Sequence, residues 1–166
     1  DGWLGTCFIP EHADVFLKEI SAGAAKAGRS LSDIDIHAGG SFEISDDVER
    51  LVAARKPGMA FQLGAMGSPS TNFYNDAFCR SGYEDAAKEV QGLWVSGKRE
   101  EAAARVPDEM VLKGNLIGTE DMVRERLQAF RDAGVTTMGI GTSGHTWKER
   151  TESLEQAVDF IRRESA

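Results

Sequence analysis

The chain is organised around residues 63–111, which read LGAMGSPSTNFYNDAFCRSGYEDAAKEVQGLWVSGKREEAAARVPDEMV. Apolar residues recur at helical spacing in three parts of this stretch, 72–80, 83–95 and 99–106, with turns at Gly82 and Gly97 between them. The segments on either side alternate simply between strand and helix. An irregular insertion between such simple units is a common place for substrate-binding residues. We therefore expect one domain, residues 1–166, that carries a helical insertion at residues 67–113.

Outside the insertion, the sequence predicts a repeating order of strands and helices. Ile34, Ile36 and Ala38 alternate with polar residues, as in a strand with one buried face. The predicted strands are 2–9, 34–44 and 135–140, with an extended segment at 114–119, and the predicted helices are 11–27, 47–56, 59–66, 120–133 and 146–164. This alternation implies right-handed crossovers and a parallel sheet, and hence the α/β class. Because an eight-stranded barrel typically needs about 250 residues, three such units match only part of a (β/α)8 barrel.

Composition and charge argue against several classes of function. The net charge is -8 and no basic patch is present, so nucleic acid and anionic membrane surfaces are poor partners. No apolar run is long enough to span a bilayer, and no metal-binding motif or phosphate-binding loop is present. Cys7 and Cys79 lie far apart and predict free thiols in a reducing cytoplasm. Because Asp1 falls inside what reads as a strand, we also expect a piece of a longer protein.

Many runs of the sequence resemble the C-terminal half of bacterial luciferase-like oxidoreductases, above all the branch that uses the deazaflavin coenzyme F420. These runs are Met59–Gly67, Asn72–Asn75, Gly82–Glu84, Gln91, Gly97–Lys98, Glu100–Ala104, Val106–Glu109, Leu116–Glu120 and Ala133–Thr137. The resemblance implies a TIM-like (β/α)8 barrel, of which this chain holds about three β/α units, with F420, or FMN in sister branches, at the C-terminal mouth. It also implies hydride transfer between C5 of the deazaflavin and a small organic substrate, with the hydride chemistry supplied by the cofactor.

The resemblance further implies cofactor contacts near the ends of the strands. The candidates are Gly2, Trp3, Gly39, Gly40, Gly141 and Thr142. Glycine lets a ligand approach the backbone closely, and the loops after the last two strands of such barrels often bind phosphate. Each candidate has an alternative interpretation. Trp3 could pack in the core, and the glycines could serve a bulge and a tight turn of the chain itself.

Three other residues, Tyr74, Lys113 and His37, are candidates for substrate contact. Tyr74 would either line the mouth of the site or pack the insertion onto the barrel. Lys113 would either hold an anionic substrate or lie at the solvated surface. His37 could reach a ligand if the polar side of its strand faces the barrel axis, and would otherwise be a hydrogen-bonded core histidine. We interpret His145 as a cap of the last helix, and the sequence singles out no catalytic residue.

Two alternatives to an F420-dependent oxidoreductase stay open. The first is an FMN-dependent monooxygenase of the same family, which binding measurements with F420 and FMN would distinguish. The second is a non-catalytic half barrel that serves as a binding or assembly module. Open strand edges favour pairing with other chains, so we expect the isolated chain to form homo-oligomers and to lack oxidoreductase activity.

Overall fold

Four parallel strands form the centre of the structure, a computed structural model that describes residues 1–68 and 70–164. They are β1 (Gly2–Leu4), β2 (Asp35–Ile44), β3 (Leu116–Gly118) and β4 (Thr137–Gly141). β2 is central, and it pairs with β1 through its first residues, with β3 through its last residues and with β4 through residues 37–41. β3 is the segment that the sequence predicted to be extended.

β1 and β3 lie one after the other along the same edge of β2. Odd-numbered residues of β2 make the backbone hydrogen bonds on this edge: the amide of Gly5 donates to His37, and the amide of Asp35 donates to Asp1. Ser45 is the odd-numbered residue just after the end of β2, and its amide donates to Gly118 of β3. β4 uses the even-numbered residues on the opposite edge. The middle of β2 is therefore left without a strand partner on one side, between the end of β1 and the start of β3.

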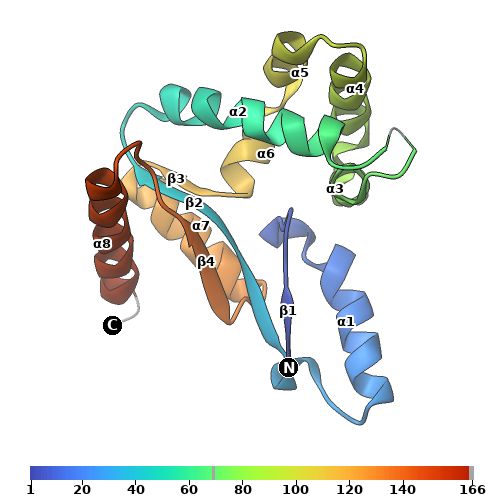
Figure 1. Ribbon diagram of the computed structural model, residues 1–166. Helices are drawn as coiled ribbons and strands as arrows, with labels where there is room; N and C mark the ends of the chain where they lie inside the picture. The colour runs from blue at the N-terminus through green and yellow to red at the C-terminus, as the bar shows by residue number, and fades with distance from the viewer. Residues whose placement is uncertain (69, 165–166) are drawn as a thin grey trace.

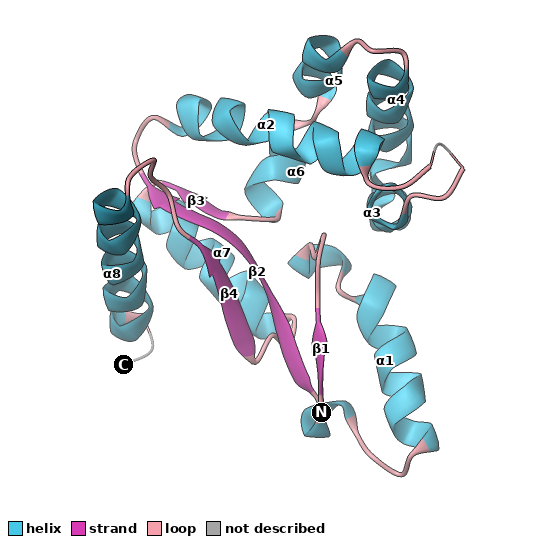
Figure 2. Ribbon diagram, in the orientation of Figure 1, coloured by secondary structure: helices cyan, strands magenta, loops and turns pink. Residues whose placement is uncertain are grey.

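One group of helices runs beside the strands, and a second group gathers beyond the end towards which the strands point (Figures 1 and 2). The first group is α1 (Asp14–Lys26), α7 (Glu120–Asp132) and α8 (Trp147–Arg163). The second group is α2 (Val48–Ala65), α3 (Phe73–Phe78), α4 (Glu84–Val95), α5 (Arg99–Arg105) and α6 (Asp108–Lys113). We call α2–α6 the helical cap, and the end of the sheet beneath it the mouth.

Short polar side chains begin several of these helices, as their sequences predict. Asp47 accepts a hydrogen bond from the amide of Arg50 at the start of α2. Thr119 caps α7, and Thr146 caps α8 by accepting from the amide of Glu149. Such caps satisfy amides that have no partner inside the helix. The interpretation of His145 as the cap of the last helix is wrong, because the hydroxyl of Thr146 fills that role.

Two helix boundaries differ from the prediction. The sequence predicts a break at Pro57, whereas α2 continues through it. Pro57 lacks an amide hydrogen, so the carbonyl of Ala53 loses its helical partner. Both residues lie on the exposed side of α2, where water can take that place. The predicted helix 11–27 divides into a short 3-10 turn, Pro10–His12, followed by α1.

Two apolar clusters hold the structure together. One lies between the sheet and the outer helices, and its fully buried aromatic residues are Phe42, Phe130 and Phe160. The other lies inside the helical cap, around Leu51, Leu63, Val90 and Met110. The parallel sheet with its outer helices confirms the predicted α/β class. Within residues 1–68 and 70–164, no helix has both the length and the apolar character that crossing a bilayer requires.

Candidate functional site

Among residues 1–68 and 70–164, no helix lies over one face of the sheet (Figure 2), and we call it the inner face. Side chains alternate between the two faces of a strand. Ile36, Ala38 and Phe42 of β2 are buried beneath the outer helices, so the odd-numbered residues of β2 point to the inner face. In a closed barrel, this face surrounds the axis. The polar side of β2, with His37, therefore faces the interior, and this orientation is the condition for any contact between His37 and a ligand.

Glycine dominates the inner face near the mouth. Gly39 of β2 pairs with Gly139 of β4, and Ser41 pairs with Gly141. Bulky branched side chains usually fill the interior of such barrels. Bare backbone at these positions leaves room for a ligand or for another part of the protein.

The reason for glycine differs among these positions. A Cβ atom on Gly39 would lie 2.0 Å from the carbonyl oxygen of Gly139, and one on Gly40 would lie 2.3 Å from that of Gly114. A Cβ atom on Gly139 would lie 2.9 Å from Nε2 of His37. Backbone carbonyls of the protein itself thus require glycine at positions 39 and 40, whereas Gly139 meets only the end of the His37 side chain. At Gly141 the nearest atom would be Cα of Ser41 at 3.4 Å, an ordinary contact, so packing does not explain glycine there.

A small cavity of about 260 Å³ occupies the mouth beside the middle of β2, where β1 has ended and β3 has not begun. Residues 5–9 after β1, residues 39–41 of β2, and Met59 and Gln62 of α2 line it. Asn115, which follows α6, also lines this cavity and contacts the unpaired middle of β2. Its Oδ1 accepts from the amide of Ser41 (2.8 Å) and its Nδ2 donates to the carbonyl of Val111 (2.7 Å). Asn115 thereby supplies the backbone partner that a strand would otherwise provide.

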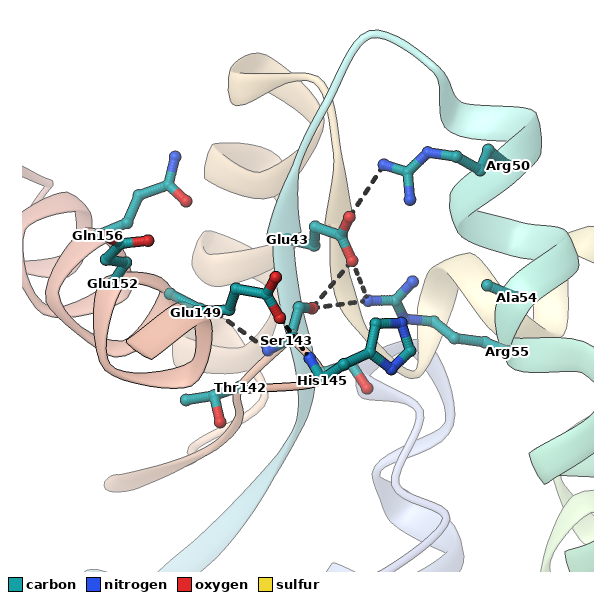
Figure 3. Close-up of a pocket in the computed structure, with 13 residues that line it drawn as sticks. Glu43, Arg50, Ala54, Arg55, Thr142, Ser143, His145, Glu149, Glu152 and Gln156 are labelled. Carbon is teal, nitrogen blue, oxygen red and sulfur yellow. Dashed lines mark hydrogen bonds and ion pairs between the residues drawn. The ribbon is translucent and has the colours of Figure 1, made fainter. Parts of the chain in front are cut away.

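A larger and more open cavity of about 840 Å³ lies between the end of β2, the loop after β4, the first turns of α2 and the start of α8. Figure 3 shows its lining residues. Ser41 borders both cavities, so they meet at the inner face of β2.

Glu43 is the centre of the polar contacts in the larger cavity (Figure 3). One carboxylate oxygen accepts from Arg50 Nη2 (2.9 Å), and the other accepts from Arg55 Nη2 (2.9 Å) and from the hydroxyl of Ser143 (2.8 Å). Partial burial by itself opposes ionisation of Glu43. The hydrogen bonds from Arg55, Arg50 and Ser143 outweigh it and hold the pKa of Glu43 below its usual range.

Three amides just before α8 already have partners within the protein. The carboxylate of Glu149 accepts from the amides of His145 (2.7 Å) and Thr146 (2.9 Å), and Ser153 Oγ accepts from the amide of Ser143 (3.0 Å). A phosphate group could bind the amides of His145 and Thr146 only by replacing the Glu149 carboxylate.

The structure brings four of the six predicted cofactor residues to the mouth. Gly39 and Gly40 line the small cavity, Thr142 lines the larger one, and Gly141 lies between them opposite Ser41.

Gly2 and Trp3 lie elsewhere, for two different reasons. Gly2 pairs with Asp35 at the opposite end of the sheet from the mouth. The indole of Trp3 points to the helix side, where its ring centroid is 5.1 Å from that of Phe16 and 6.0 Å from that of Phe8. Trp3 therefore packs in the core and does not face the mouth, because its position in β1 directs its side chain towards α1.

The three predicted substrate residues do not meet at either cavity. His37 is on the inner face, but one layer below the mouth and beside Gly139. Tyr74 packs edge-on against Phe73 in α3, with ring centroids 5.8 Å apart. Lys113 Nζ lies 2.5 Å from a carboxylate oxygen of Glu109, and this hydrogen bond raises the pKa of Lys113.

Several residues of the two cavities were not predicted as site residues. They are Glu43, Arg50, Arg55, Asn115, Ser143 and Cys7. The alternation of β2 places Glu43 on the inner face, and this signal could have found it. Nothing in the local sequence marks Ser143 as its partner, because the two are 100 residues apart. Burial raises the pKa of Cys7 to about 11, so its thiol stays protonated near neutral pH.

Comparisons with known proteins agree with this geometry. The family model of the luciferase-like monooxygenases matches residues 1–137. A putative coenzyme F420-dependent oxidoreductase of Mycobacterium tuberculosis is 37% identical over 142 residues, which are 84% of this chain and 41% of that protein. The 5,10-methylenetetrahydromethanopterin reductase of Methanopyrus kandleri is 29% identical over 155 residues, or 93% of this chain and 42% of that protein.

A solved structure gives the same result for the fold. The coenzyme F420-dependent tetrahydromethanopterin reductase from Methanopyrus kandleri superposes with a TM-score of 0.63 at 27% identity, over 94% of this chain and 42% of that one. The chain thus spans less than half the length of the relatives that it matches, which is consistent with a partial barrel. The family match over most of its residues shows that this chain belongs to the luciferase-like monooxygenase family.

Proposed function

We propose that residues 1–166 form the C-terminal part of an F420-dependent oxidoreductase, with about three β/α units of its barrel and a helical insertion at 67–113. The relatives described above are oxidoreductases whose names include coenzyme F420 or a pterin-reducing activity. The observation that carries the proposal is Gly141. It is a mouth residue on the inner face where a side chain would fit the protein, so a bound ligand is the best reason for glycine.

The residues at the mouth fit a flat cofactor ring. In this proposal, the bare backbone at Gly141, with Thr142 beside it, forms one wall, and Gly39 and Gly40 form another in the small cavity. F420, when bound, supplies hydride exchange with a small organic substrate. The chain contributes shape and hydrogen bonding, and the protonated thiol of Cys7 adds no charge to the small cavity. FMN at the same place is the alternative cofactor.

His37 is the substrate-side candidate that this geometry favours. It faces the barrel interior, whereas Lys113 is held by Glu109 and Tyr74 by Phe73. We propose a small-molecule substrate that enters from the mouth and a cytoplasmic location, where Cys7 and Cys79 would stay as the free thiols that the structure has.

Titration with each cofactor tests the proposal. F420 and FMN are added separately to the full-length protein that contains residues 1–166, and not to the isolated chain. Binding is followed through cofactor fluorescence. Saturable binding of F420, weakened by Gly141→Val, is expected. Binding of FMN without F420 would move the protein to the FMN-dependent branch, and binding of neither would reject the cofactor site.

Open edges and exposed apolar side chains favour a second candidate, an assembly role for the chain. β1 and β4 each pair with β2 alone among the described strands, so each has one free edge. Leu4 is 75% exposed and Trp147 is 85% exposed. We therefore propose that the isolated chain self-associates and is inactive by itself. Light scattering with a parallel oxidoreductase assay checks this, and an active monomer would refute it.

A further inference from the structure

We propose that Glu43 is a positioning residue that fixes the loop after β4 to the helical cap and so sets the width of the mouth. This inference rests on the proposed function only for its effect on cofactor binding. The proposed role of Glu43 in fixing the loop to the helical cap is argued only from contacts within the chain.

The carboxylate of Glu43 joins three separate segments. Arg50 and Arg55 come from α2, Glu43 itself comes from β2, and Ser143 comes from the loop after β4. Arg55 Nη2 also donates to the hydroxyl of Ser143 (3.3 Å), which closes a three-membered network. The carboxylate of Glu43 is therefore the charged acceptor that α2 and the loop share, and it adds to the direct contacts of Ser143 with Arg55 and with the carbonyl of Phe42 (3.2 Å).

The network is sheltered enough to be strong. The side chain of Arg55 is only 15% exposed and that of Glu43 is 25% exposed. Arg55 Nε is buried without a hydrogen-bond partner among the described residues, so the guanidinium depends on Glu43, on the carbonyl of Leu51 and on the longer contact with Ser143, and Glu43 is the only carboxylate among these three. Removing one member of such a pair leaves the other charge uncompensated, which costs far more than breaking a pair at the surface. Arg50, at 53% exposed, contributes less.

The two arms of this network reach both cavities. The loop that holds Ser143 also carries Thr142, a wall of the larger cavity. The helix that holds Arg55 continues to Met59 and Gln62, which line the small cavity. A change at Glu43 should therefore alter both walls, although Glu43 is not required to touch the cofactor.

The test compares Glu43→Gln with Ser143→Ala and with the control Glu89→Gln. Glu89 forms an exposed ion pair with Arg105 between α4 and α5, so E89Q removes a carboxylate–arginine contact away from the mouth. Hydrogen exchange is measured for residues 141–146 and 48–56, together with F420 affinity and the unfolding midpoint in urea. Glu43→Asp serves as the conservative variant, because it keeps the charge and shortens the reach.

We expect E43Q to speed exchange in residues 141–146 by about tenfold and to weaken F420 binding by about the same factor. Ser143→Ala, which keeps Glu43 and both arginines, should show the exchange effect even if E43Q folds poorly. Glu43→Asp should recover part of both effects, and E89Q should show neither. If residues 141–146 exchange at the wild-type rate in both E43Q and S143A, the inference is overturned. If wild-type protein binds no F420, the proposed function fails, whereas the exchange result still decides the positioning role.

Discussion

Alanine at positions 39 and 141 separates two reasons for glycine on the same inner face. A Cβ atom on Gly39 would lie 2.0 Å from the Gly139 oxygen, whereas real Cβ atoms essentially never come under 3.0 Å. β2 and β4 would have to separate by at least about 1 Å at the centre of their pairing, as the difference between these two distances shows. We expect overpacking of about 1–3 kcal/mol, plus about 1 kcal/mol for a weakened backbone hydrogen bond.

Gly141→Ala should behave in the opposite way. Its nearest neighbour would be an ordinary 3.4 Å contact, and Gly141 is not among the residues with positive φ. Alanine there restricts the unfolded chain and should stabilise the protein by about 0–1 kcal/mol. If Gly141 is glycine for the sake of a ligand, the same variant should lose F420 affinity while it keeps its stability.

Urea unfolding followed by circular dichroism gives the free energy of unfolding of both variants. The expected loss for Gly39→Ala is about 2–4 kcal/mol, a large part of the stability of an ordinary domain. An unchanged slope with denaturant would show that the unfolded state is the same. Equal stabilities of the two variants, or a stable Gly39→Ala protein, would refute the assignment of Gly39 to strand packing.

Three other changes test the fold and the polar network. Phe42→Ala removes a fully buried ring between β2 and α8 and should cost about 3–5 kcal/mol in urea unfolding; a cost below 1 kcal/mol would contradict the observed packing. Asn115→Ala leaves the amide of Ser41 without its acceptor and should cost about 1–3 kcal/mol, while an unchanged midpoint would show that water replaces it. The lowered pKa of Glu43 adds stability that is present above its unfolded pKa of about 4.3 and is lost as pH falls through the folded pKa. Urea midpoints between about pH 3 and 6 should therefore fall less steeply in Glu43→Gln than in wild type, and identical slopes would contradict this.

The sequence predicts much of the fold because its patterns are local. The alternation in residues 34–44 identifies both faces of β2, and Asp47 and Thr119 mark the starts of α2 and α7. Pro57 misleads, because a break in the helix depends on whether the freed carbonyl can reach water. Access of that carbonyl to water depends on the tertiary structure, and residues 53–57 alone do not reveal it.

The site is harder to predict because its contacts join distant segments. Glu43 and Ser143 meet only when β2 and β4 pair, and no local motif records that contact. Trp3 was a reasonable cofactor candidate from its place in a strand, but the direction of its indole depends on the register of β1 against β2. Glycines 39 and 141 look alike in the sequence, and only the distance to the facing strand distinguishes them.

The most direct test of the proposed function is a fluorescence titration of F420 into the protein that carries residues 1–166, with FMN as the comparison and Gly141→Val as the variant. We predict saturable binding of F420 in preference to FMN, weakened roughly tenfold or more by the valine side chain, a loss of about 1.4 kcal/mol or more. Preferential binding of FMN, or F420 binding that Gly141→Val leaves unchanged, would contradict it.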